Sequence, residues 1–291
     1  MLLNKKISVL AFVKLIRYNI IAICSYAVIV GMLDQYSFMA KISVPLALTA
    51  TVGTVVSLLL SFRTAQSYER WWEARTVWGA IVNDSRTLIR QLMEFLPDTP
   101  DKEMQLKTFV DRHVIWCYAL SESLRRRPFS QPVITYLATE KIDELNIPNA
   151  LLTRHGMDLS TLNLTEFRQV QIDSTITRLC DAMGKCERIK NTVFPRSYSL
   201  LVHVLIYIFA TLLPFGLDDQ YLYVETGLTI LIPLMFISIE RTAILMQDPF
   251  ENLPMDTPMT TISTTIEINL KQMTGNPDTP PMPASNTYYQ M

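Results

Sequence analysis

Glycine is scarce in this sequence, with 8 residues in 291, while 49% of the residues are hydrophobic. A soluble domain of this length usually contains more glycine and fewer apolar residues. An excess of charge of one sign is also missing, because the formal net charge is −1. The chain therefore has no overall basic field for nucleic acid, and we expect no nucleic-acid partner.

Cysteine is equally sparse. The chain has four cysteines, which form neither a disulfide framework nor a CxxC metal pair. Isolated buried thiols are therefore expected. The four lie at Cys24, Cys117, Cys180 and Cys186.

Signatures of catalysis are absent. The sequence contains no GxxxxGK[ST], HExxH or GxSxG motif, and no GxGxxG after a strand. The three histidines, His113, His155 and His203, are far apart and lack metal-ligand spacing. For His113, a hydrogen bond in the core or between helices is favoured over a metal. We expect no enzyme, no catalytic residue, no metal and no cofactor.

What the chain does contain is long apolar runs. A run of about 20 residues can cross about 30 Å of hydrocarbon as a helix. Four such runs in a soluble fold of this size would be hard to bury, so buried helices are the weaker alternative. The runs lie at 18–33 (extended by 9–16), 42–62, 198–213 and 223–239.

Between the second and third runs the character changes. Residues 63–196 carry charges of both signs at helical spacing, with apolar residues on a repeating face, which is typical of amphipathic helices in water. From residue 275 onward the chain is rich in Pro, Thr and Asn, and we expect it to be disordered or wrapped over a neighbouring subunit. The domains expected are 1–62 with two spans, 63–196 as a cytosolic helical domain, 197–245 with two more spans, and a cytosolic segment at 246–291.

Basic residues predict the orientation. The N-terminal segment carries Lys5, Lys6, Lys14 and Arg17, whereas the short links between paired spans carry a single lysine, Lys41. The positive-inside rule then puts both termini and the middle region in the cytoplasm. We expect a multi-pass, all-α protein of the cell inner membrane, with membrane lipid as one partner.

The stretch 54–75 connects the second span to the polar region without a Pro or Gly. Its surroundings are expected to change from lipid or protein interior to water between Phe62 and Arg63. Thr54, Leu58 and Phe62 share one helix face. In an oligomer that face could form rings around a pore and gate it by dewetting. From spacing alone, packing inside the chain's own bundle is the favoured alternative.

Several motifs resemble the signature of the bestrophin family, especially its bacterial branch. They occur in the same order and extend over nearly the whole chain. They read FRT at 62–64, YERWWEAR at 68–75, NDSR at 83–86, CERI at 186–189, QDPFEN at 247–252 and IEINL at 266–270.

The resemblance implies a homopentameric channel for small monovalent ions, with a central pore and a wide cytosolic vestibule. The matching positions of its hydrophobic neck are Thr54, Leu58 and Phe62, although Thr54 departs from the bulky apolar residue expected there. A second, cytosolic constriction is implied at Ile172, with Val170 as the competing candidate. The alternative is a membrane-anchored helical scaffold or sensor that conducts no ions.

The same resemblance gives expectations about Ca²⁺ binding and about the permeant ion. Animal relatives bind Ca²⁺ through a dense acidic run after their Pro-Phe motif, but the segment 251–256 has too few carboxylates, so we expect no Ca²⁺ clasp. The turn at 248–250 is expected to dock the tail. An uncharged neck has no preference for one sign of charge. Chloride-type anions are favoured, and monovalent cations stay possible.

Overall fold

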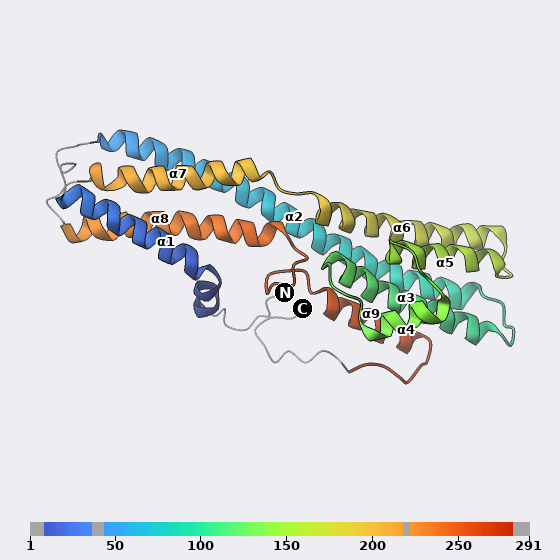
Figure 1. Cartoon of the computed structure of the whole chain (residues 1–291). Helices are drawn as coiled ribbons and strands as arrows, with labels where there is room; N and C mark the ends of the chain where they lie inside the picture. Colours follow the sequence, from blue (N-terminus) through green and yellow to red (C-terminus); the bar gives the residue numbers. More distant parts are fainter. Residues whose placement is uncertain (1–8, 37–43, 218–221, 282–291) are drawn as a thin grey trace. The chain divides into compact units, whose positions relative to one another are not determined.

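The computed structural model describes residues 9–36, 44–217 and 222–281, and this part of the chain is helical with connecting turns (Figure 1). The helices are α1 (Val9–Tyr36), α2 (Leu46–Phe95), α3 (Lys102–Leu124), α4 (Gln131–Glu140), α5 (Ile147–Thr161), α6 (Glu166–Asn191), α7 (Arg196–Phe215), α8 (Leu222–Gln247) and α9 (Met259–Met273). Residues 282–291 of the tail expected to be disordered lie outside the described residues.

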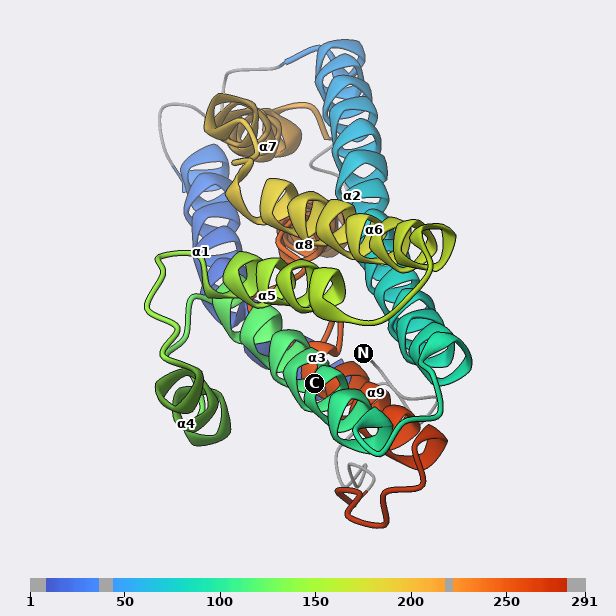
Figure 2. The ribbon, with the colours of Figure 1, turned by 90° about the vertical axis from the view of Figure 1, so that its right-hand side faces the viewer.

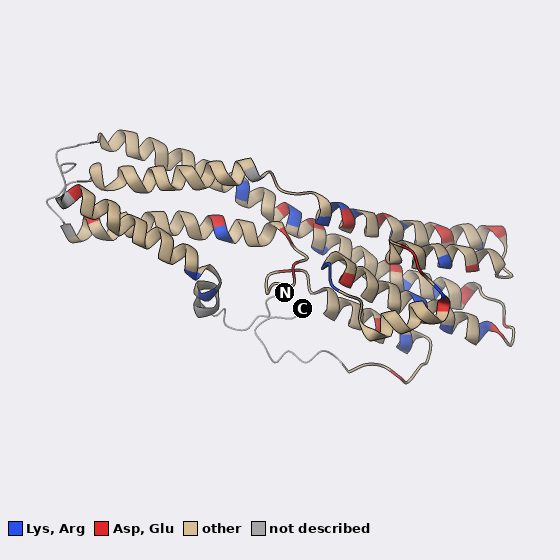
Figure 3. Ribbon diagram, in the orientation of Figure 1, with Lys and Arg blue, Asp and Glu red and all other residues tan. Residues whose placement is uncertain are grey.

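Contacts divide the described residues into two units. The four-span unit comprises residues 9–36, 44–70, 193–217 and 222–247, and the polar-helix unit comprises residues 71–192 and 248–281. Helix α2 contributes to both. Figure 3 shows few charged residues along α7 and α8, and charges of both signs along α3, α5 and α6.

Four helices are long and apolar enough to cross a membrane, as the apolar runs predict. Residues 42–43 of the second predicted run lie outside the described residues. The candidate spans are Ile16–Asp34, the apolar part of Leu46–Phe95, Ser197–Phe215 and Tyr223–Gln247.

In the polar-helix unit, α3 contacts α4, α5, α6 and α9 (Figure 2). Proline at the first turn of α4 and of α5 explains where these helices begin, because a first-turn N–H has no partner within the helix. The core includes the fully buried Trp78, Trp116 and Leu120. Hydrophobic burial against α3 therefore holds this unit together.

Two histidines lie inside this core. His113 Nε2 is 2.8 Å from Ser85 Oγ, whose own hydrogen is donated to the Ile81 carbonyl. His113 must therefore donate from Nε2, as expected for a hydrogen bond between helices. Burial lowers the pKa of His113 from 6.5 to about 3, and it lowers the pKa of His155, which stacks on Phe109. Both imidazoles are neutral at pH 7.

In the four-span unit, α1, α7 and α8 contact one another. Helix α2 lies along α7 through a series of specific contacts. The Phe209 ring sits so close to Gly53 that a Cβ there would be 2.8 Å from it. Further along, the Tyr198 hydroxyl donates to the Leu59 carbonyl at 2.8 Å. Glycine at position 53 thus permits the close approach of α7.

A buried ion pair fixes the end of the apolar stretch of α2. Arg63 Nη1 lies 3.6 Å from Glu240 Oε1 on α8, and both side chains are at most 1% exposed. The second oxygen of Glu240 accepts a hydrogen bond from His203 Nδ1 at 2.9 Å. The Arg63 guanidinium also lies over the Phe194 ring. The sequence predicts water at Arg63, but the structure encloses this side chain in protein, because carboxylate and aromatic partners are available to it.

Acid should destabilise the protein through His113. Between pH 6.5 and about 3 the unfolded chain binds a proton at this side chain that the folded chain does not. The free energy of unfolding is therefore at its full value above pH 6.5 and decreases as the pH drops below it. At pH 5 the decrease is about 2 kcal/mol. Replacing His113 with Gln keeps an N–H donor for Ser85. Thermal melts in detergent should show a smaller loss of Tm between pH 7 and pH 5 for this variant than for wild type. An equal loss would contradict the assignment.

Removing one partner of the Arg63–Glu240 pair should leave a buried, uncompensated charge. For Glu240→Gln we expect a loss of about 3–5 kcal/mol, or roughly 10 °C in Tm. The double variant Arg63→Met with Glu240→Gln should recover much of this loss. The control is Arg90→Met in the half-exposed Arg90–Glu94 pair, whose loss should stay within about 1 kcal/mol. Equal Tm losses for Glu240→Gln and Arg90→Met would show that the buried pair matters no more to stability than the half-exposed pair.

Candidate functional site

Helix α2 has one packed face and one free face within the four-span unit. The packed positions recur at alternating spacings of three and four residues, so they lie on one side of the helix. Their side chains are at most 2% exposed. Among them are Val56, Leu60, Arg63 and Ser67.

The three predicted neck residues lie together on the free face. Leu58 is 55% exposed, Phe62 is 57% exposed, and Thr54 is exposed as well. Because neighbouring members are four positions apart, successive side chains are about 6 Å apart along the helix axis. The structure thus brings the predicted trio together on a surface that the chain itself does not cover.

Two hydroxyl groups of the free face donate to the helix's own backbone. Thr54 Oγ1 donates to the Ala50 carbonyl at 2.9 Å. Ser57 Oγ donates in the same way to the Gly53 carbonyl at 2.8 Å. Because these hydrogens are already donated, the face has fewer groups with which to hold water.

This face differs from the exposed faces of α7 and α8. Exposed positions within 200–208 of α7 and within 228–239 of α8 are all apolar, such as Leu201, Ile208 and Leu231. On α2, by contrast, exposed Thr51, Thr54, Ser57 and Ser61 alternate with apolar residues. Acyl chains suit these two apolar stretches better, so the free face of α2 differs chemically from the exposed stretches 200–208 and 228–239.

The two candidates for the second constriction lie on α6 and face different ways. Ile172 is fully buried in the core of the polar-helix unit, whereas Val170 is 68% exposed. Two residues along a helix correspond to a turn of about 200°. Burial therefore disfavours Ile172, the first choice from the sequence, and leaves Val170 as the side chain that could line a passage.

The segment 248–257 folds as a turn in the polar-helix unit. Phe250 is buried, and Asp256 Oδ2 accepts a hydrogen bond from the Leu253 N–H at 2.9 Å. Burial raises the pKa of Asp256 to about 6. Glu251 pairs with Lys190 at 2.6 Å. These carboxylates do not fit a Ca²⁺ site, because one is neutralised by lysine and the other caps the turn.

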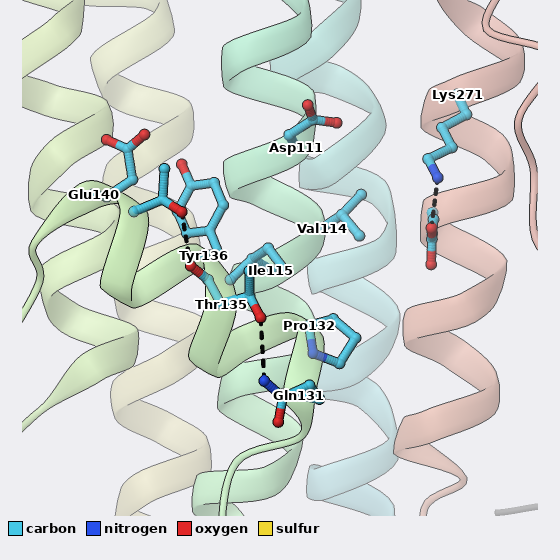
Figure 4. A pocket seen from close by; sticks show the side chains of 11 residues that line it. Asp111, Val114, Ile115, Gln131, Pro132, Thr135, Tyr136, Glu140 and Lys271 are labelled. Carbon is cyan, nitrogen blue, oxygen red and sulfur yellow. Dashed lines mark hydrogen bonds and ion pairs between the residues drawn. The ribbon is translucent and has the colours of Figure 1, made fainter.

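No group of three His, Cys, Asp or Glu side chains in metal-binding proximity occurs among the described residues. A cavity of about 640 Å³ opens between α3, α4 and α9 of the polar-helix unit (Figure 4). Asp111 and Tyr136 line it, and Lys271 is paired with Glu267 at 2.8 Å. The cavity contains none of the predicted site residues.

The cluster of Arg63, Glu240 and His203 is not among the sites that the sequence predicts. A signal was present, because an ionisable residue inside an apolar run usually has a partner and a role. His203 lies within the third run and Glu240 directly after the fourth. Their pairing could not be predicted, because the two residues belong to different helices.

Comparisons with known proteins are consistent with one another. The model of the family described as Bacterial/Fungal Bestrophin protein matches residues 7–272. The voltage-dependent anion channel-forming protein YneE of Salmonella typhimurium is 31% identical, over 92% of this chain and 88% of that protein. Its Escherichia coli K12 namesake is 28% identical, over 90% and 88% of the two chains.

The fold is also similar to that of solved structures. A bacterial bestrophin homolog from Klebsiella pneumoniae superposes with a TM-score of 0.81 at 27% identity, covering 89% of this chain and 98% of that one. The motifs and the four apolar helices are thus accompanied by similarity over nearly the whole length. The chain belongs to the bacterial and fungal bestrophin family.

Proposed function

We propose that this chain forms a homopentameric ion channel in the cell inner membrane, with α2 of each subunit facing a central pore. The polar-helix unit and both termini then lie in the cytoplasm. The observation that carries the proposal is the free face of α2: Leu58 and Phe62 are more than half exposed, whereas Leu60 and Arg63 on the packed face are buried.

The neck consists of rings of Thr54, Leu58 and Phe62. Apolar rings narrow a channel and gate it by dewetting, without any charge at the constriction. Thr54 forms a smaller ring, and its hydroxyl hydrogen is donated to the helix backbone. The proposal assigns the second constriction to Val170, because its side chain is exposed on α6.

Small monovalent ions are the proposed cargo, with chloride-type anions favoured and monovalent cations possible. The support is the set of relatives named as voltage-dependent anion channel-forming proteins, which this chain matches over most of their length. No Ca²⁺ is required for conduction, since Glu251 is paired with Lys190 on α6 and Asp256 caps the turn.

The alternative is a membrane-anchored scaffold or sensor without conduction. Such a protein would turn this side of α2 toward lipid, so the exposed residues should be as uniformly apolar as those of 200–208 and 228–239. The exposed hydroxyl groups of Thr51, Thr54 and Ser57 among the apolar residues of α2 therefore favour the channel.

Ion flux into liposomes tests the proposal. Leu58→Ala and Phe62→Ala widen the neck and reduce its apolar surface, so each should raise flux by at least about threefold. The matched control is Leu231→Ala, which removes an equally exposed leucine from the uniformly apolar face of α8 and should leave flux unchanged. Absence of flux in wild type would contradict the channel, and equal flux in all variants would contradict the neck.

A further inference from the structure

The free face of α2 continues past the neck. Ala65 and Glu69 are both exposed, and they follow Phe62 at spacings of three and four residues. This spacing keeps them on the side of the helix that carries Leu58 and Phe62. Glu69 lies seven residues, or about 10 Å along the helix, beyond Phe62. All of these residues belong to the four-span unit.

Glu69 is the first charged residue on this face. Between residues 46 and 68 the sequence contains a single charged residue, Arg63. Arg63 is buried on the packed face and paired with Glu240. The Glu69 side chain is exposed. Within the part of the chain that the structure describes it forms no ion pair, so its negative charge is not neutralised by a cationic side chain.

We propose that Glu69 sets the balance between cations and anions in the pore, as a ring of carboxylates just beyond the neck. This inference rests on the proposed function, because the ring forms only if the free faces of several copies surround one axis. An uncharged neck does not discriminate by sign, so the nearest fixed charge decides the local ion concentrations. Carboxylates raise the concentration of cations and lower that of anions at the neck entrance.

The distance between the ring and the neck makes the effect dependent on salt. The Debye length is about 10 Å at 0.1 M salt, roughly 30 Å at 0.01 M and about 3 Å at 1 M. The carboxylates therefore act on ions at Phe62 in dilute salt and are screened in concentrated salt. A purely structural role for Glu69 would not depend on salt in this way.

The test is the reversal potential of the full-length protein in a planar bilayer under a NaCl gradient. In dilute salt, Glu69→Gln should lower the permeability ratio of Na⁺ to Cl⁻ by at least about threefold, because the local excess of cations is lost. Glu69→Asp keeps the charge and should keep the wild-type ratio. At about 1 M salt the difference between wild type and Glu69→Gln should vanish. Glu103→Gln removes an exposed carboxylate from another helix, α3, and should leave the ratio unchanged.

Thermal melts of each variant establish that the fold is intact, which is expected because the Glu69 side chain is exposed. An unchanged reversal potential for Glu69→Gln in dilute salt, in a channel whose flux responds to Leu58→Ala, would overturn the role of Glu69 and leave the pore standing. A wild-type protein that passes no ions would overturn both.

Discussion

The buried pair of Arg63 and Glu240 is the constraint on which the arrangement of α2 depends. A guanidinium at the end of an apolar stretch needs a carboxylate, and Glu240 on α8 supplies it. Once Arg63 points toward α8, the rotation of α2 about its own axis is fixed. Phe62 and Leu58 then lie on a different side of the helix, because each residue turns it by about 100°.

The chemistry of the free face follows from this rotation. Its apolar residues are exposed, and the hydroxyl groups of Thr51, Thr54 and Ser57 all donate to the helix backbone. From residue 46 to residue 62 there is no charge at all. Such a surface can border water without holding it strongly, which suits a constriction that empties and fills. Glu69 lies beyond this stretch, at the first position where the same face becomes charged.

Much of this could be predicted from the sequence, because the signals are local. Each span follows from the length and hydropathy of one run, and the helical period places Thr54, Leu58 and Phe62 on one face. Their assignment to a neck came from the resemblance to the bestrophin family, because spacing alone favoured packing inside the chain's own bundle. The packing of α6 could not be predicted, because burial of Ile172 and exposure of Val170 depend on the neighbouring helices. The burial of Arg63 was missed for the same reason, since its partner lies far away in sequence.

The most direct test of the central claim is a cysteine scan of α2 with a charged thiol reagent, read as ion flux. The scan uses a Cys180→Ser background, because Cys180 is an exposed native thiol. The account predicts block of flux at Thr54→Cys, Leu58→Cys and Phe62→Cys, and no block at Leu231→Cys on α8. Two results would contradict a pore lined by the free face of α2. One is equal block at Leu231→Cys and at the three α2 positions, and the other is no block at any of those three positions.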